Sequence, residues 1–120
     1  MAYDEELAER VRGVLDGGPL PTEKKMFGGL AFLIDGHMAV AVSGRGGLMV
    51  RVDPEAGERL TDAPAVAPMV MRGREMPGWL RVAAEAVAGD RELRAWVERG
   101  VAYVRTLPPK TARKKSAKNP

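Results

Sequence analysis

Bulky apolar residues recur at every second position in three successive runs over residues 30–52, the period of β-strands with two distinct faces. The runs are broken at Asp35-Gly36 and at the glycine-rich residues 44–47. Because such breaks between alternating runs favour hairpins, this stretch predicts a three-stranded antiparallel meander.

Two registers are compatible with the first turn. A two-residue turn at Asp35-Gly36 places Phe32 opposite Ala39 and mixes bulky and small residues on each face. A three-residue loop of Ile34, Asp35 and Gly36, closed by a bulge, pairs Phe32 with Met38 and Leu30 with Val40. We expect the second register, because it gathers the bulky residues on one face. The other face then carries a small, mostly apolar set, which we expect another element to cover: Ala31, Leu33, His37, Ala39, Ala41, Met49 and Arg51.

Helical periodicity frames this meander. Residues 4–16 predict a helix with Asp4 as N-cap, and a final helix is expected from Asp90, as its cap, to about Arg105, with Trp96 in its buried stripe. Between them the sequence predicts a short helix over Pro54–Leu60 capped by Asp53, a loop from Ala63-Pro64 to Ala67-Pro68, and strands over Met69–Arg72 and Trp79–Val82 joined by a turn from Gly73 to Gly78. The predicted fold is α+β in two layers. An antiparallel sheet of about five strands (a three-strand meander, the short helix and a two-strand hairpin) carries the N-terminal and C-terminal helices.

Length and composition place this fold in one domain. The 120 residues predict a folded body over 1–107 and a disordered tail over 108–120. The absence of cysteine excludes disulfides and thiolate metal sites. The acidic N-terminus does not resemble a secretory signal, and no apolar run approaches the roughly 20 residues that span a bilayer. We therefore expect a cytoplasmic protein.

The net charge of +3 is unevenly distributed along the chain. Residues 1–109 hold 14 basic and 16 acidic residues, whereas the tail carries five basic residues and no acid: Lys110, Arg113, Lys114, Lys115 and Lys118. A flexible basic arm of this kind binds nucleic acid weakly and without sequence preference, through counterion release. The alternative is a tail that only keeps the protein in solution.

Three segments together carry a family resemblance: Met26-Phe27-Gly28-Gly29 with the meander that follows, Met49-Val50-Arg51-Val52, and Gly73-Arg74-Glu75-Met76-Pro77-Gly78-Trp79. With the final helix in its matching place, the sequence resembles the N-terminal domain of the TfoX/Sxy family over roughly residues 4–106. The resemblance implies helices packed on an antiparallel sheet. The better-known members carry a second, helical domain and regulate natural competence, whereas this chain ends in the basic tail. The family brings no agreed catalytic or ligand-binding residues.

Two groups of residues are candidate sites. The first comprises arginines on or beside neighbouring predicted strands, which together would bind a phosphate or carboxylate unless they pair with acids such as Asp53 and Glu75: Arg51, Arg72, Arg74 and Arg81. The second is the small-residue face, whose exposed apolar patch predicts homodimerisation: Ala31, Leu33, Ala39 and Ala41.

Other conspicuous residues have structural interpretations. The single histidine, His37, is expected in solvent beside a turn, and a lone histidine forms no histidine-rich metal site. Met26-Phe27-Gly28-Gly29 leads into a strand, so a bulge or a close backbone approach explains its glycines better than a phosphate cradle. Trp79 is expected in the sheet core, with an exposed binding role as the alternative. We expect no metal site and no cofactor.

The sequence therefore favours a non-enzymatic regulatory or interaction protein, since its carboxylates are scattered and form no acid–base pair. Weak nucleic-acid association through the tail would add to this role. The alternative function is the binding of a small anionic ligand, such as a phosphometabolite, at the arginine-lined sheet edge.

Overall fold

The computed structural model describes residues 3–16, 18, 21–26, 28–62 and 65–108. Three α-helices, one short 3-10 helix and six strands follow one another along these residues: α1 (Glu5–Leu15), β1 (Thr22–Met26), β2 (Gly29–Ile34), β3 (His37–Val42), β4 (Leu48–Arg51), α2 (Pro54–Leu60), β5 (Val66–Met71), β6 (Arg74–Val82), η1 (Ala84–Val87) and α3 (Asp90–Val104).

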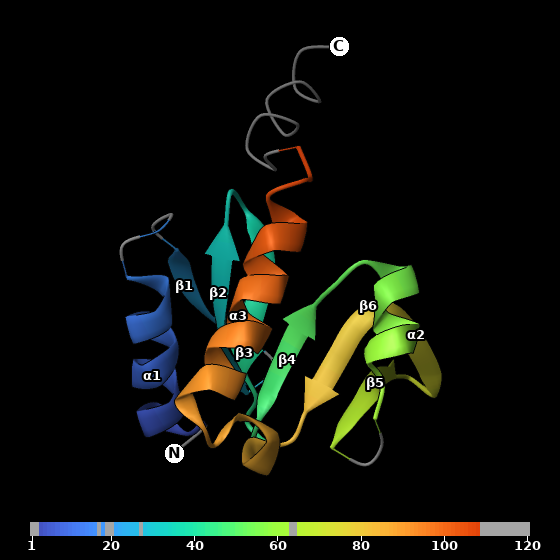
Figure 1. The fold of residues 1–120 in the computed structure, drawn as a ribbon, viewed down its shortest axis with the longest axis horizontal. Helices are drawn as coiled ribbons and strands as arrows, with labels where there is room; N and C mark the ends of the chain where they lie inside the picture. Colours follow the sequence, from blue (N-terminus) through green and yellow to red (C-terminus); the bar gives the residue numbers. More distant parts are fainter. Residues whose placement is uncertain (1–2, 17, 19–20, 27, 63–64, 109–120) are drawn as a thin grey trace.

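The strands form one antiparallel sheet in the order β1-β2-β3-β4-β6-β5. Helices α1 and α3 lie side by side across one face, and α2 packs against β6 (Figure 1). The α+β class and the antiparallel sheet are confirmed. The strand count is six rather than about five, because residues 22–26 form an edge strand that pairs with β2.

The alternation pattern misses β1 for a physical reason. Its sequence, Thr-Glu-Lys-Lys-Met, has no apolar alternation, and four of its five residues are exposed. Edge strands often carry lysines, which discourage pairing with another chain. An edge strand of this kind is recognisable only once its partner β2 is in place.

The second hairpin also differs from the prediction. Strand β5 begins at Val66, inside the stretch expected as a loop, and its turn to β6 is Arg72-Gly73, with both residues at positive φ. Gly78 belongs to β6 and marks an irregularity in the pairing with β5. Its φ is +86°, and its carbonyl accepts a 2.8 Å hydrogen bond from the Val52 backbone N–H.

The expected register of the first hairpin is wrong. Asp35 and Gly36, with φ of 54° and 86°, form a two-residue turn, and Ile34 pairs with His37. The register then shifts between Phe32 and Leu33, so that Leu33 pairs with Met38 and Phe32 with Val40. The bulge lies within the strands and not in the loop, yet it still keeps Phe32 and Val40 on one face.

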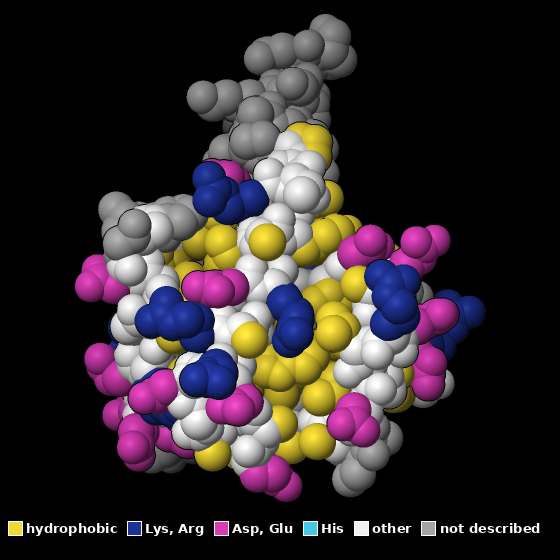
Figure 2. All heavy atoms as spheres, in the orientation of Figure 1, with side chains coloured by type: hydrophobic (Ala, Val, Ile, Leu, Met, Phe, Trp, Pro, Cys, Tyr) yellow, Lys and Arg dark blue, Asp and Glu magenta, His cyan; other side chains and the backbone are white. Residues whose placement is uncertain are grey.

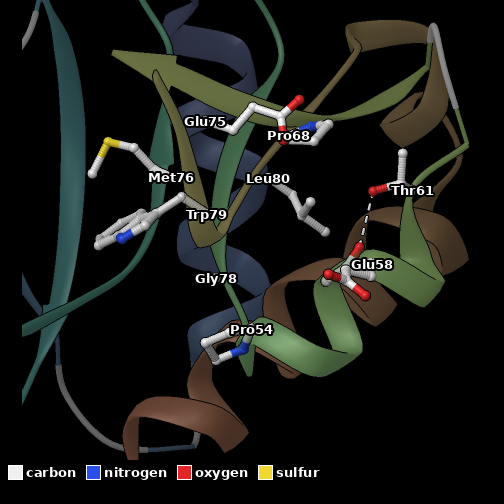
Figure 3. A pocket seen from close by; sticks show the side chains of 10 residues that line it. Pro54, Glu58, Thr61, Pro68, Glu75, Met76, Gly78, Trp79 and Leu80 are labelled. Carbon is white, nitrogen blue, oxygen red and sulfur yellow. Dashed lines mark hydrogen bonds between the residues drawn. The ribbon is translucent and has the colours of Figure 1, made fainter. Parts of the chain in front are cut away.

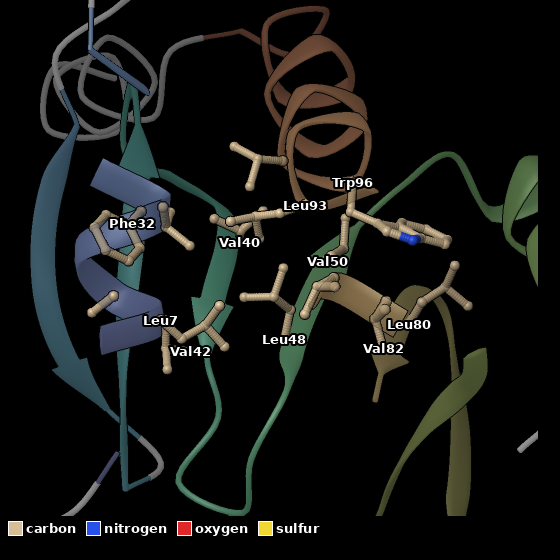
Figure 4. Packing of buried hydrophobic residues seen from close by; sticks show 14 of the residues in the cluster. Leu7, Phe32, Val40, Val42, Leu48, Val50, Leu80, Val82, Leu93 and Trp96 are labelled. Atoms are coloured by element: carbon tan, nitrogen blue, oxygen red, sulfur yellow. The ribbon is translucent and has the colours of Figure 1, made fainter. Parts of the chain in front are cut away.

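The main core lies between the sheet and the helices. Figure 4 shows side chains from the sheet meeting those of α1 and α3, and the core residues labelled there are Leu7, Phe32, Val40, Val42, Leu48, Val50, Leu80, Val82, Leu93 and Trp96. Trp96 is 8% exposed, which confirms its place in the core. Burial of this apolar surface is the principal stabilising contribution.

The helix starts follow the sequence closely. The Asp4 carboxylate accepts a hydrogen bond from the Leu7 backbone N–H at 3.1 Å, and Asp53 accepts one from Glu55 at 3.2 Å. The last helix differs in detail: Gly89 is its N-cap, and Asp90 is the first helical residue. Within the described residues, every helix is too short or too polar to cross a membrane.

Candidate functional site

The second face of the sheet, called the outer face below, carries an apolar cluster made of strand residues alone. Its members come from five strands: Met26, Ala31, Leu33, Met38, Ala41, Met49 and Met69. Among the described residues, no helix contributes to this cluster, whereas α1, α3 and η1 all contribute to the main core. The element expected to cover this face is therefore not found in the described part of the chain.

One row of paired residues crosses the outer face from edge to edge. Each member is opposite the next in the strand register: Lys24, Ala31, Ala41, Met49, Arg81 and Ala67. Ala31 and Ala41 at its centre are 0% and 2% exposed, while Met26, Met38 and Met69 around them are partly exposed. Flexible methionine side chains thus surround a floor of small residues, and such surfaces adapt to the shape of a bound partner.

The bulge in β2–β3 decides which residues reach this face. Ala39, expected on the outer face, packs instead with Ile34 and Val104 beneath α3, so that part of the prediction is wrong. Met38, expected among the core residues, takes its place on the outer face. The added residue reverses the alternation at this point and exchanges a small side chain for a long, flexible one.

Cations flank the apolar centre of the outer face. Lys24, at one end of the central row, and Arg81, next to its other end, are exposed. None of the strand residues that share this face by alternation is acidic. The helix side differs, since Figure 2 shows acidic and basic side chains mixed around an apolar area over α3, β4 and α2.

The neighbouring strand positions illustrate this division. Glu23 lies on the helix side of β1 and forms a bidentate ion pair with Arg12 of α1, at 2.7 and 2.9 Å. The hydrogen bonds from Arg12 lower the pKa of Glu23, and those to Glu23 raise the pKa of Arg12. The Glu23 carboxylate therefore joins α1 to the sheet, and it does not form an ion pair with Lys24 on the outer face.

Arg51 occupies a distinctive position at the end of β4. Its guanidinium carbon lies 5.0 Å from the centroid of the Trp79 ring on β6 and 5.6 Å from the centroid of the Tyr103 ring on α3. Both distances are within the range of cation–π attraction. Tyr103 was not singled out in the sequence, although it follows Trp96 by two helical turns and so shares its side of α3.

The other candidate arginines are distributed over two places. Arg51 and Arg81 lie on the neighbouring strands β4 and β6, where Arg51 pairs with Trp79 and Arg81 pairs with Met49. Arg72 and Arg74 lie at the turn of the β5–β6 hairpin, where both are exposed. Strand pairing therefore brings Arg51 and Arg81 near one another, whereas alternation from the Met69–Met76 pair places Arg74 on the outer face closer to the hairpin turn.

His37 is buried, which corrects its expected place in solvent. It is 6% exposed, and its Nε2 lies 2.7 Å from the carbonyl oxygen of Pro108. Because a carbonyl only accepts hydrogen bonds, His37 is the donor and carries a proton on Nε2. This contact holds the segment after α3 against the tip of the first hairpin.

A shallow pocket lies between α2 and the β5–β6 hairpin and has a volume of about 100 Å³. Figure 3 shows Leu80 directed toward α2 and Trp79 directed to the other side of β6, beside Met76. Ligand pockets typically have volumes of about 300–1,000 Å³. This pocket is too small to hold more than a side chain.

The remaining candidate residues predicted from the sequence either have a structural role or lie outside the described residues. A side chain at Gly29 would collide with the carbonyl oxygen of Val42, which confirms the close backbone approach expected for this glycine. The five basic tail residues (Lys110, Arg113, Lys114, Lys115 and Lys118) lie outside the described residues. In the described ranges, no group of three acidic or histidine side chains could hold a metal ion.

These features define a two-layer α+β protein whose chemistry-bearing surface is a methionine-rich sheet face flanked by cations. Comparison with protein families gives a match to the TfoX N-terminal domain over residues 15–104. The chain belongs to this family, as its sequence motifs indicated. No curated protein and no solved structure matches the chain significantly.

Proposed function

We propose that this protein is a non-enzymatic interaction module that binds an acidic, amphipathic segment of a partner protein on its outer face. The observation that carries the proposal is the apolar alanine and methionine centre between Lys24 and Arg81. In the described part of the chain, neither of these cations forms an ion pair. Acidic side chains of a partner would supply the missing charges.

The chemistry of this face supports binding rather than catalysis. A guanidinium stays protonated at any physiological pH, so it donates hydrogen bonds but does not exchange protons. Thioethers and methyl groups contribute contact area and adaptability. These groups suit recognition of a segment with apolar residues at its centre and carboxylates at its edges.

The same charges weigh against a second copy of the chain as the occupant, although homodimerisation stays a prediction that no observation tests. In a face-to-face dimer, a twofold axis along the strands would place Lys24 against Arg81 of the copy. An axis across the strands would place each of these cations against its own counterpart. Like charges in contact are destabilising, so we expect a different, acidic partner.

Methionine methyl groups give a direct test of the proposed surface. We would label them with ¹³C and add a short amphipathic helical peptide of leucine, alanine and glutamate, or its counterpart with lysine for glutamate. The acidic peptide should shift the methyl signals of Met26, Met38, Met49 and Met69, which lie on the outer face. The basic peptide should shift none of them, because it meets cations.

Charge reversal provides the matched control. The double variant Lys24→Glu, Arg81→Glu should abolish the shifts. Lys25→Glu with Arg91→Glu should retain them, because Lys25 pairs with Leu30 of the core and Arg91 is on α3. Equal binding of both peptides, or no shift of these methyl groups, would contradict the proposal. Shifts that depend on the concentration of the protein alone would indicate a second copy as the occupant.

We further propose that the basic tail adds weak, non-specific nucleic-acid binding. What supports this is the five positive charges of residues 110–118, which follow a body with a net charge of −2. Phosphate contacts by flexible lysines and arginines release counterions and need no fixed geometry. The salt dependence of DNA binding, compared between the full chain and a chain that ends at Leu107, tests this proposal.

A further inference from the structure

Three elements meet at the end of β4 around one guanidinium. Arg51 is the last residue of β4, Trp79 is its partner on β6, and Tyr103 comes from the last turns of α3. The guanidinium carbon is within 6 Å of both ring centroids, at 5.0 and 5.6 Å. Contact with two rings restricts the orientation of a side chain that would otherwise sample many rotamers.

The hydrogen-bonding edge of Arg51 remains available. Among the described residues, Arg51 forms no side-chain hydrogen bond and no ion pair. In the described part of the chain, every fully buried side-chain nitrogen has a hydrogen-bond partner. The guanidinium nitrogens of Arg51 have no such partner there, so they are accessible to solvent. The result is a half-buried, oriented cation whose N–H groups still reach solvent.

We propose that Arg51, Trp79 and Tyr103 form a carboxylate-binding site. A guanidinium edge offers two parallel N–H donors, which match the two oxygens of a carboxylate. The aromatic rings exclude water from one side of this contact and offer an apolar wall to the group that bears the carboxylate. Because the guanidinium is already oriented, little conformational entropy is lost on binding.

The charge of the site favours a carboxylate over a phosphate. A phosphate carries more charge and three acceptor oxygens, and clusters of arginines recognise it well. Here one arginine is in contact with the rings, and the nearest cation by register, Arg81, lies in the adjoining row opposite Met49. A single guanidinium balances a single negative charge. The ligand is therefore a carboxylate on an apolar group, either a small free acid or the C-terminus of a peptide.

This inference goes beyond the proposed docking surface and does not depend on it, since a free carboxylate suffices to fill the site. The chain also contains a matched control. Arg99 lies 4.5 Å from the centroid of the Trp96 ring, but it contacts one ring only and is exposed. If a ligand shifts the NMR signals of Arg51 and Trp79 but not those of Arg99 and Trp96, the shift reflects binding at this site and not a general ionic effect.

The test is an NMR titration of the full chain that follows the indole N–H of each tryptophan and the Nε–H of each arginine. Benzoate and inorganic phosphate are added separately at constant ionic strength, and sodium chloride is added in a parallel series as the control for general ionic effects. Benzoate should shift the Trp79 and Arg51 signals saturably, and it should leave the Trp96 and Arg99 signals in place. A short acetylated peptide that ends in phenylalanine, with a free or an amidated C-terminus, completes the series.

Variants make the outcome decisive. Arg51→Gln should abolish the saturable shift, and Arg51→Lys should weaken it by about tenfold or more, since an ammonium lacks the paired donors. Arg99→Gln should change nothing. Unchanged indole and methyl signals elsewhere would confirm that each variant is folded.

Each result has a defined meaning. Saturation by benzoate assigns the site to small acids, and saturation by the free-acid peptide but not the amidated one assigns it to protein termini; both support a carboxylate site. Tighter binding of phosphate, an equal response to sodium chloride, or an unchanged response in Arg51→Gln would overturn the proposal. None of these results depends on whether an acidic peptide binds the methionine face.

Discussion

At the scale of single residues, Arg12 and Glu23 show how one ion pair connects two elements. The pair is bidentate, with N–O distances of 2.7 and 2.9 Å, and Arg12 also contacts Glu9 at 2.7 Å. About a third of each side chain in the pair is exposed. Solvent therefore screens the interaction, and its contribution to stability is modest.

Replacement of Glu23 by glutamine should lower the free energy of unfolding by about 0.5 kcal/mol at pH 7. Because Arg12 holds the pKa of Glu23 below its ordinary value of 4.5, the contribution is fully present above pH 4.5. It is lost as the pH falls through the lowered pKa of the folded state. Urea unfolding at pH 7 and at low pH should therefore give a difference between variant and wild type that disappears in acid.

A matched control for this pair lies on α3. Arg94 and Glu98 are 3.5 Å apart, and both are more than half exposed. Glu98→Gln should change the stability less than Glu23→Gln at pH 7. Equal effects of the two substitutions would mean that the bidentate geometry contributes nothing.

At the scale of elements, the contact between α3 and β3 depends on one small residue. Gly100 is buried in the middle of α3, directly over the backbone of β3. A Cβ at this position would collide with the carbonyl oxygen of Ala39 and lie 3.1 Å from Cγ1 of Val40. The absence of a side chain lets the helix approach the strand closely.

Gly100→Ala should destabilise the protein by about 1–3 kcal/mol, although alanine is the better helix former, because α3 must move away from the sheet. Gly13→Ala in α1 is the control, since nothing lies within 4 Å of its added Cβ. That substitution should stabilise the protein by about 0.5–1 kcal/mol. Thermal and urea unfolding measure both effects, and a stabilising Gly100→Ala would contradict the packing described here.

At the scale of the whole molecule, charge separates the body from the tail. Residues 1–109 have a net charge of −2, and the last eleven residues have +5. An acidic body repels DNA, so any affinity for DNA should come from the tail.

Fluorescence anisotropy with duplex DNA over a range of salt concentrations tests this separation. If the five tail charges each displace a counterion, log affinity should fall against log salt with a slope of about −4.5. A chain that ends at Leu107 should not bind at any salt concentration. Equal binding by the shortened chain would move the nucleic-acid site to the body, and no binding by either chain would leave the tail as a solubilising segment.

The sequence by itself determined the features that depend on short-range chemistry. Helices α1, α2 and α3 follow from the 3.6-residue period and from caps such as Asp4 and Asp53, and the meander follows from the two-residue period. Family membership follows from motifs in their order along the chain. For the outer face, alternation correctly placed Ala31, Leu33 and Ala41 together.

Only the tertiary structure decided where these patterns meet. Alternation fixes the relation of neighbours within one strand, but a single bulge exchanged Ala39 for Met38 on the outer face. The polar strand β1 brought Lys24 to the edge of that face, and strand and helix packing brought Tyr103 to Arg51. His37 likewise found its partner at Pro108. Such contacts join residues far apart in sequence, and their geometry is set by how the sheet pairs and where the helices pack.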